Sequence, residues 1–348
     1  MYRDAECLYW ALSHEFEGQI EIFYADNLRK IEPSDKSSLN REFCQKTTEL
    51  VFGQWLKELD VIYLLEVINP LVLDFVDETT KIFYVPNLEW AIIDVVDQGV
   101  EAWKKFLKTY ERRITVIAKT QKISEVLTKN SVSNVLIDWS IPDDIIKTKP
   151  SPLRFLRNIF SKKKIILMNA GTGGWKSRRG VDVMLEAACK ISKNRNYHFI
   201  LKTIKPWEDY QLEGIPENVE LIEGFQNREE LNLLVDSADM VIYPSRFEGF
   251  GLSLLETLHR GKPVMCTDGW PMSELQTIDD ERLKISILKY TELRLAISYE
   301  PSSDSIVSNL EKLSNKNLSR EFSQKMVVSG LKERQELFVN RICSMLTN

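Results

Sequence analysis

The chain has 348 residues, of which 46 are Lys or Arg and 51 are Asp or Glu, so its net charge is -5 at pH 7. At about 150 residues per domain, this length predicts two domains. A composition that is 43% hydrophobic and 28% charged is typical of a folded protein with a large core. The acidic balance excludes a protein whose main work is to coat nucleic acid, because neutralising phosphates requires an excess of Lys and Arg. We therefore expect no nucleic-acid partner.

The first 140 residues alternate between helical and strand patterns. Apolar residues at helical spacing predict a helix over 4–16, and the β-prone run IEIFY follows at 20–24. Four further strands each follow a helical segment, namely DVIYLL, KIFYV, RITVIA and NVLID. This order predicts a mainly parallel sheet covered by helices on both faces, and hence a first α/β domain over residues 1–140. We expect this domain to open on the helix, without a preceding strand and glycine-rich loop.

Residues 141–163 have a different composition and predict a linker. Pro142, Pro150 and Pro152 interrupt regular structure, and basic residues outnumber acidic ones. One interpretation of the apolar and basic residues of 147–164 is peripheral contact with an anionic membrane surface. Packing of a connecting helix between the domains is the interpretation we favour.

The second half of the chain repeats the alternation. Strands at KKIILMNA, YHFILKT, VELIEG, DMVIYPS and KPVMCT, with helices near 180–192, 227–237 and 252–260, predict a second α/β domain over 164–301. Residues 302–348 predict helices that pack back towards the first domain. Ligands of such sheets bind beyond the carboxyl ends of the strands, so we expect the site in a cleft between two facing Rossmann-like domains.

The most informative run is YPSRFEGFGLSLLETLHRGKPV at 243–264, which joins a strand to a glycine loop and a helix. Gly249 and Gly251 let a ligand approach the backbone, and N–H groups at the helix start, near 252–253, favour a phosphate. Glu248 before the helix and Glu256 within it can accept hydroxyl groups of sugars.

The segment from Glu248 to Glu256 resembles the E-x7-E donor motif of the retaining GT-B glycosyltransferases, the glycosyl transferases group 1 family. Segments 169–187 and 219–245 are similar to the other nucleotide-binding segments of that family. The resemblance implies an α/β fold of two Rossmann-like domains (GT-B), of which 1–140 would bind the acceptor and 164–301 the nucleotide sugar. It also implies transfer of a hexose from a UDP- or GDP-linked donor to a glycan or lipid-linked glycan, with retention of configuration, in polysaccharide or glycoconjugate synthesis.

The resemblance also implies the site residues. Glu248 and Arg179 are the implied catalytic residues, which orient the sugar and stabilise the leaving diphosphate. The implied donor-binding residues are Gly171, Gly173, Gly174, Lys176, Arg178, Gly224, Phe225, Gly249, Phe250, Gly251, Leu252, Ser253 and Glu256.

The sequence predicts no metal and no cofactor. It contains no Asp-x-Asp triplet, and its three histidines do not pair at metal spacing. Lys176, Arg178 and Arg179 would offset the diphosphate charge that a metal ion offsets elsewhere. The segment GTGGWKSRRG lacks the spacing of a dinucleotide loop and of a Walker A loop.

Cysteine usage and hydropathy favour a cytoplasmic protein. If 147–164 binds lipid, we expect the protein to associate peripherally with the inner face of the membrane. Five scattered cysteines form no C-x-x-C pair, and no secretion signal or uninterrupted apolar span is visible. Two alternatives to a transferase stay open. One is a non-catalytic sugar-nucleotide-binding partner subunit, and the other is a sugar-nucleotide epimerase of the same fold.

Overall fold

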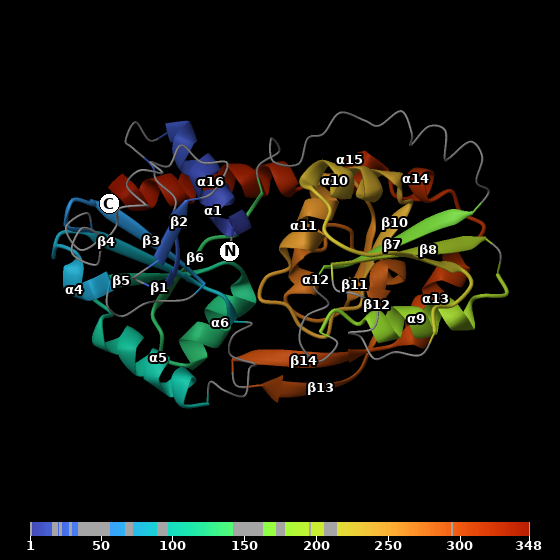
Figure 1. Cartoon of the computed structure of the whole chain (residues 1–348), viewed down its shortest axis with the longest axis horizontal. Coiled ribbons are helices and arrows are strands. Elements are labelled where there is room, and N and C mark those ends of the chain that lie inside the picture. Colours follow the sequence, from blue (N-terminus) through green and yellow to red (C-terminus); the bar gives the residue numbers. More distant parts are fainter. Residues whose placement is uncertain are drawn as a thin grey trace. The chain divides into compact units, whose positions relative to one another are not determined.

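The computed structural model describes residues 2–15, 20, 23–27, 30–33, 56–66, 72–88, 97–141, 163–171, 178–194, 196–204, 214–293 and 295–347. The chain divides into two compact units (Figure 1). The first comprises Met1–Pro142 together with Arg334–Asn348, and the second comprises Asp143–Glu333. The predicted helical tail is therefore shared, since 302–333 belong to the second unit and 334–348 to the first.

The first unit is built on a four-stranded parallel sheet. Its strands pair in chain order, β3 (Val61–Glu66), β4 (Lys81–Pro86), β5 (Ile114–Ala118) and β6 (Asn134–Leu136). Helices α4 (Val72–Phe75), α5 (Asp97–Thr109) and α6 (Gln121–Lys129) connect them, as parallel neighbours require. These strands confirm the four that the alternating pattern predicted.

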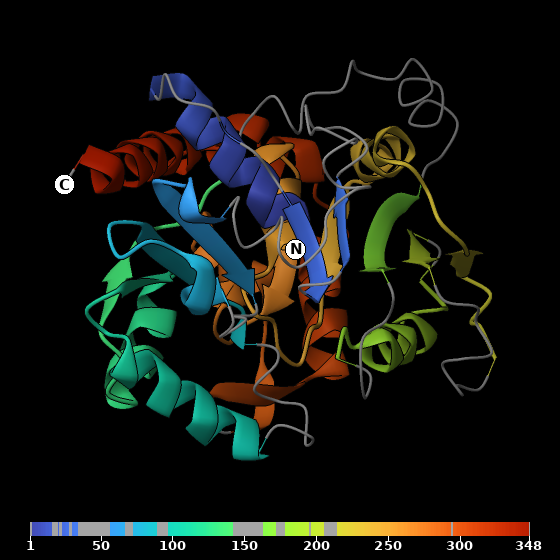
Figure 2. The same ribbon diagram turned by 60° about the vertical axis from the view of Figure 1, so that its left-hand side comes forward.

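Both ends of the chain join this unit. Helix α1 (Tyr2–Glu15) packs beside the C-terminal helix α16 (Leu331–Thr347), and the Sγ atom of Cys343 lies 3.5 Å from the carbonyl oxygen of Ala11 (Figure 2). A buried ion pair, 3.0 Å between Lys119 Nζ and Asp4 Oδ2, ties α1 to the end of β5. The initial helix was predicted, and its apolar face accounts for its docking.

The predicted strand at 20–24 has a different partner from the one expected. Strand β1 (Phe23–Asn27) pairs antiparallel with β2 (Lys30–Pro33) and does not join the parallel sheet. Only two residues, 28–29, separate these strands, and so short a connection can only return a strand antiparallel, because a parallel return requires a longer crossover. The helical segment predicted before the strand DVIYLL, residues 39–59, lies outside the described residues except for its end at 56–59.

The second unit contains a six-stranded parallel sheet in the order β12-β11-β10-β7-β8-β9. The strands are β7 (Lys164–Gly171), β8 (Tyr197–Thr203), β9 (Val219–Ile222), β10 (Met240–Tyr243), β11 (Val264–Thr267) and β12 (Lys284–Ile285). Helix α9 (Val181–Lys190) covers one face, and α10 (Arg228–Ser237) and α11 (Leu252–His259) cover the other (Figure 1). The fold class predicted from the sequence, α/β with two units built on parallel sheets, is confirmed.

Residues 284–301 form strands that the sequence reading did not assign. After the short strand β12, β13 (Ile287–Leu293) pairs antiparallel with β14 (Ala296–Pro301). Most of β13 is exposed, so it shows none of the apolar alternation that predicts a half-buried strand. The remaining helices of the second unit are α12 (Met272–Leu275), the 3-10 turn η5 (Glu281–Leu283), α13 (Ser303–Leu313), α14 (Leu318–Glu321) and α15 (Gln324–Val327).

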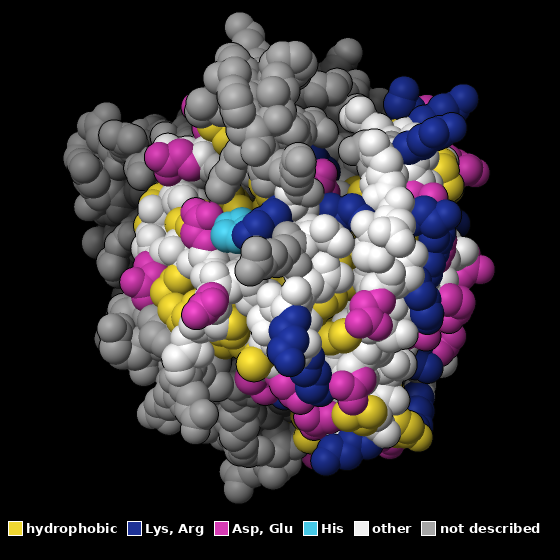
Figure 3. All heavy atoms as spheres, turned by 90° about the vertical axis from the view of Figure 1, so that its right-hand side faces the viewer, with side chains coloured by type: hydrophobic (Ala, Val, Ile, Leu, Met, Phe, Trp, Pro, Cys, Tyr) yellow, Lys and Arg dark blue, Asp and Glu magenta, His cyan; other side chains and the backbone are white. Residues whose placement is uncertain are grey.

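The described part of the chain contains no helix that is both long and apolar enough to span a bilayer. On the face shown in Figure 3, the described Lys and Arg side chains are interspersed with Asp and Glu. Of the segment 147–164 considered for membrane contact, 147–162 lies outside the described residues.

Candidate functional site

The candidate site lies where the strand order of the second unit reverses, at the carboxyl ends of the neighbouring strands β7 and β10. Each strand leads through a loop into a helix, β7 into α9 and β10 into α11. The caps of these helices are Gly180, with φ +70°, and Gly251, with φ +98°. The first N–H groups of a helix have no partner within it, so two helix starts bring partial positive charge to this edge.

Gly180 is required by the packing of α9 against β10. A Cβ atom at this position would lie 2.0 Å from the carbonyl oxygen of Pro244, which follows β10 directly. The backbone N–H of Arg246 also donates to the carbonyl oxygen of Arg178 over 2.7 Å. The segment that enters α9 is thereby held against the segment that leaves β10.

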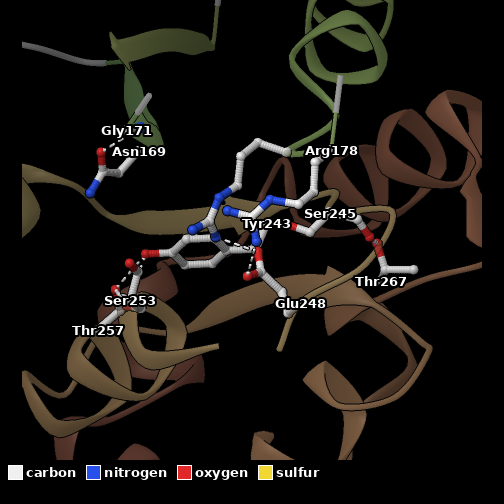
Figure 4. A network of polar contacts seen from close by, with 10 residues as sticks. Asn169, Gly171, Arg178, Tyr243, Ser245, Glu248, Ser253, Thr257 and Thr267 are labelled. Atoms are coloured by element: carbon white, nitrogen blue, oxygen red, sulfur yellow. Dashed lines mark hydrogen bonds and ion pairs between the residues drawn. The ribbon is translucent and has the colours of Figure 1, made fainter. Parts of the chain in front are cut away.

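This close approach brings Arg178 and Arg179 onto Glu248 (Figure 4). Arg178 Nη1 donates to Glu248 Oε2 over 3.1 Å, and Arg179 Nη1 donates to Glu248 Oε1. The guanidinium of Arg178 also lies 5.7 Å from the ring centre of Phe247. Glu248 is 5% exposed, so its charge is balanced by this pair and not by water. Two cations and one anion leave a net charge of +1 at the cluster.

The side chain of Tyr243 contacts the first turn of α11 (Figure 4). Its hydroxyl group donates to the carbonyl oxygen of Ser253 over 2.9 Å and lies 2.9 Å from Thr257 Oγ1. Burial raises the pKa of Tyr243 well above its usual value, so the hydroxyl keeps its proton. Beside it, the Oγ atom of buried Ser245 has no hydrogen-bond partner among the described residues, while its carbonyl oxygen accepts from Thr267 Oγ1 over 2.8 Å.

The adjoining strands supply a second group of predicted residues. Gly224 follows β9 with φ +89°, and its carbonyl oxygen accepts a hydrogen bond of 2.5 Å from the Nζ atom of buried Lys202 at the end of β8. Burial lowers the pKa of Lys202 below its usual value. The side chain of Phe225 is 83% exposed. An exposed aromatic ring above a fixed backbone offers a flat apolar surface at the carboxyl edge of the sheet.

The structure places the other predicted site residues as follows. Gly171 ends β7 with φ +56°, and its N–H donates to Asn169 Oδ1. Gly249, Phe250 and Gly251 are buried, whereas Leu252, Ser253 and Glu256 are half-buried on α11. Gly173, Gly174 and Lys176 lie outside the described residues. Among the described residues no cluster of His, Cys, Asp and Glu could hold a metal ion.

The sequence reading missed several residues that shape the cluster. It assigned no role to Tyr243, Asp182 or Arg246, and it treated Glu248 and the two arginines as separate groups. The motif alone shows that Arg178 and Glu248 are both near helix starts, but 70 residues separate them. Their direct contact follows from the adjacency of β7 and β10, which strand patterns do not reveal.

Known proteins resemble parts of this chain in sequence. Residues 153–283, which include strands β7 to β11, match the family described as glycosyl transferases group 1. An uncharacterised glycosyltransferase of Methanocaldococcus jannaschii is 26% identical over 187 residues, which cover 49% of this chain and 46% of that protein. The O-antigen chain mannosyltransferase B of Escherichia coli is 31% identical over 110 residues, covering 30% and 29%. These matches thus span less than half the length of either curated relative.

Solved structures show the same fold over nearly the whole chain. HepE of Anabaena, solved in complex with UDP and glucose, has a TM-score of 0.63 at 14% identity, with 99% of this chain and 93% of that chain covered. The lipopolysaccharide glycosyltransferase WaaG has a TM-score of 0.59 at 15% identity, with 98% and 95% covered. The fold of the chain is thus the GT-B fold. The segment that matches the glycosyl transferases group 1 family lies within its second unit.

Proposed function

We propose that this protein is a glycosyltransferase that moves a hexose from a UDP- or GDP-linked donor to a glycan or lipid-linked glycan. The observation that carries the proposal is the cluster of Arg178, Arg179 and Glu248 between the starts of α9 and α11. A net charge of +1 beside two helix starts favours a diphosphate, and a carboxylate within the same cluster can accept sugar hydroxyls.

In the proposed reaction the bond between the anomeric carbon and the diphosphate oxygen breaks, and its electron pair leaves with the diphosphate. The acceptor hydroxyl oxygen forms the new bond to the anomeric carbon, and its proton passes to the departing diphosphate. Arg179 and the N–H groups at the start of α11 stabilise the charge that develops on the diphosphate. Glu248 orients the sugar, and Glu256 accepts hydroxyl groups of the ribose. We further propose that configuration is retained and that no metal ion is needed.

The relatives support the choice of substrates. One matched relative is named an O-antigen chain mannosyltransferase, and the HepE structure contains UDP and glucose. A role in surface polysaccharide synthesis, at the cytoplasmic side where sugar nucleotides are found, is the corresponding proposal for this chain.

The test is release of nucleoside diphosphate from a panel of UDP- and GDP-sugars by the purified full chain, with EDTA present. We expect slow release without acceptor, faster release with glycan acceptors, and no loss of rate in EDTA. Glu248→Gln should reduce release by about 100-fold, the loss expected when one group that acts on the transition state is removed. Asp280→Asn, which alters an ion pair outside the cluster, is the matched control and should keep its activity. Nucleotide binding without release would favour the partner-subunit alternative.

A further inference from the structure

We propose that Arg246 is a positioning residue of the donor site, which holds the entry of α9 in place and neutralises Asp182 beside the diphosphate position. The inference rests on the proposed function for the identity of its ligand. Arg246 acts through Asp182 and the backbone of Arg178.

The side chain of Arg246 holds Asp182 through two parallel hydrogen bonds. Nη1 donates to Oδ1 and Nη2 donates to Oδ2, each over 2.8 Å. Nη2 also lies 3.7 Å from a carboxylate oxygen of Glu300 on β14. The Arg246 side chain is 15% exposed, so solvent screens this pair only in part. The hydrogen bonds to Asp182 raise the pKa of the guanidinium, which stays charged.

The backbone of Arg246 joins the same segments a second time. Its N–H donates to the carbonyl oxygen of Arg178, and its own carbonyl oxygen accepts the N–H of Tyr299 over 2.8 Å. The hydroxyl oxygen of Tyr299 in turn accepts the N–H of Trp270 over 3.1 Å. One residue therefore connects the entry of α9, the loop before Glu248 and strand β14.

The charge of Asp182 explains why this pairing matters for ligand binding. Asp182 is the second residue of α9 and lies three residues after Arg179. A carboxylate in the first turn stabilises the helix itself, but it repels a phosphate bound at the same helix start. The paired guanidinium cancels that charge while leaving the helix start and Arg179 available to the ligand.

The experiment is calorimetric titration of the full chain with UDP and with GDP. Arg246→Met should weaken binding of whichever nucleotide the wild type prefers by about tenfold. Adding Asp182→Asn should restore most of the loss, because the uncompensated carboxylate is then gone. Arg282→Met is the matched control, since Arg282 also holds an aspartate, Asp280, through two hydrogen bonds (3.0 and 2.7 Å) and reaches a glutamate on another element. It should leave the affinity unchanged.

A second measurement needs no ligand. Amide hydrogen exchange over residues 178–186 should speed up in Arg246→Met and stay at the wild-type rate in Arg282→Met. Unchanged exchange over 178–186 in Arg246→Met would overturn the positioning role. Failure of Asp182→Asn to restore nucleotide affinity would overturn the neutralising role, as would equal losses in Arg246→Met and Arg282→Met. A wild type that binds neither nucleotide would instead refute the proposed function, while the exchange measurement still decides the positioning role.

Discussion

Substitution of Gly180 by alanine tests whether the contact between α9 and β10 builds the candidate site. The new methyl group would stand 2.0 Å from the carbonyl oxygen of Pro244 and 2.9 Å from its carbon. Backbone atoms cannot rotate away, so the two segments must separate. A positive φ costs an alanine about 1–2 kcal/mol, and the overpacking costs about 1–3 kcal/mol more. We expect a loss of about 2–5 kcal/mol in the free energy of unfolding of the second unit.

Gly330 supplies the control for the backbone term. Its φ is +82°, and a Cβ atom there would meet nothing within 4 Å, so Gly330→Ala carries only the conformational cost. In urea, with a slope of about 2 kcal/mol/M, the midpoint of Gly180→Ala should lie about 1 M below that of Gly330→Ala. Because the chain has two units, unfolding should be read from hydrogen exchange of peptides in the second unit. Equal midpoints for the two variants would refute the packing argument.

Three further predictions concern single side chains. Tyr243→Phe removes the hydroxyl group that donates to Ser253 and should lower the free energy of unfolding by about 1 kcal/mol in urea titrations, and an unchanged value would argue against the anchor. Glu256→Ala should weaken nucleoside-diphosphate binding in calorimetry if this side chain holds ribose, whereas unchanged affinity would remove that role. The hydrogen bond from Arg282 lowers the pKa of Asp280 below its usual range, so the stability it contributes is complete above the ordinary aspartate pKa of about 3.9 and is lost as the pH falls through the folded value. Asp280→Asn should accordingly flatten the acid side of the stability curve, as measured by urea unfolding between pH 2 and 6.

The periodic parts of the fold could be predicted from the sequence. Strands β3 to β6 and β7 to β11 are apolar runs bounded by helices, so the pattern and the helical crossovers specify parallel sheets. Strands β1 and β13 are different. Strand β1 pairs with the segment that follows it closely in the chain, and β13 is exposed along most of its length, so apolar periodicity does not indicate which sheet β13 joins.

The candidate site was predictable in its parts and not in its contacts. The glycine loop and the two glutamates follow from residue types at fixed spacing within one segment. The pairing of Arg178 and Arg179 with Glu248 depends on which strands are neighbours. Asp182 resembles an ordinary acidic residue in a helix first turn, and only the two hydrogen bonds from Arg246 distinguish it.

The charges that stabilise the cluster of Arg178, Arg179 and Glu248 also leave it able to bind an anion. Arg179 has five N–H donors, and one of its nitrogens is assigned to Glu248. A phosphate can therefore approach Arg179 without displacing Glu248. Arg246 neutralises Asp182, the acidic residue in the first turn of α9. Asp182 therefore does not cancel the net charge of +1 on the cluster of Arg178, Arg179 and Glu248. An anion that binds there meets a site whose geometry is fixed beforehand, and preorganisation of this kind is what lets fixed charges lower a reaction barrier.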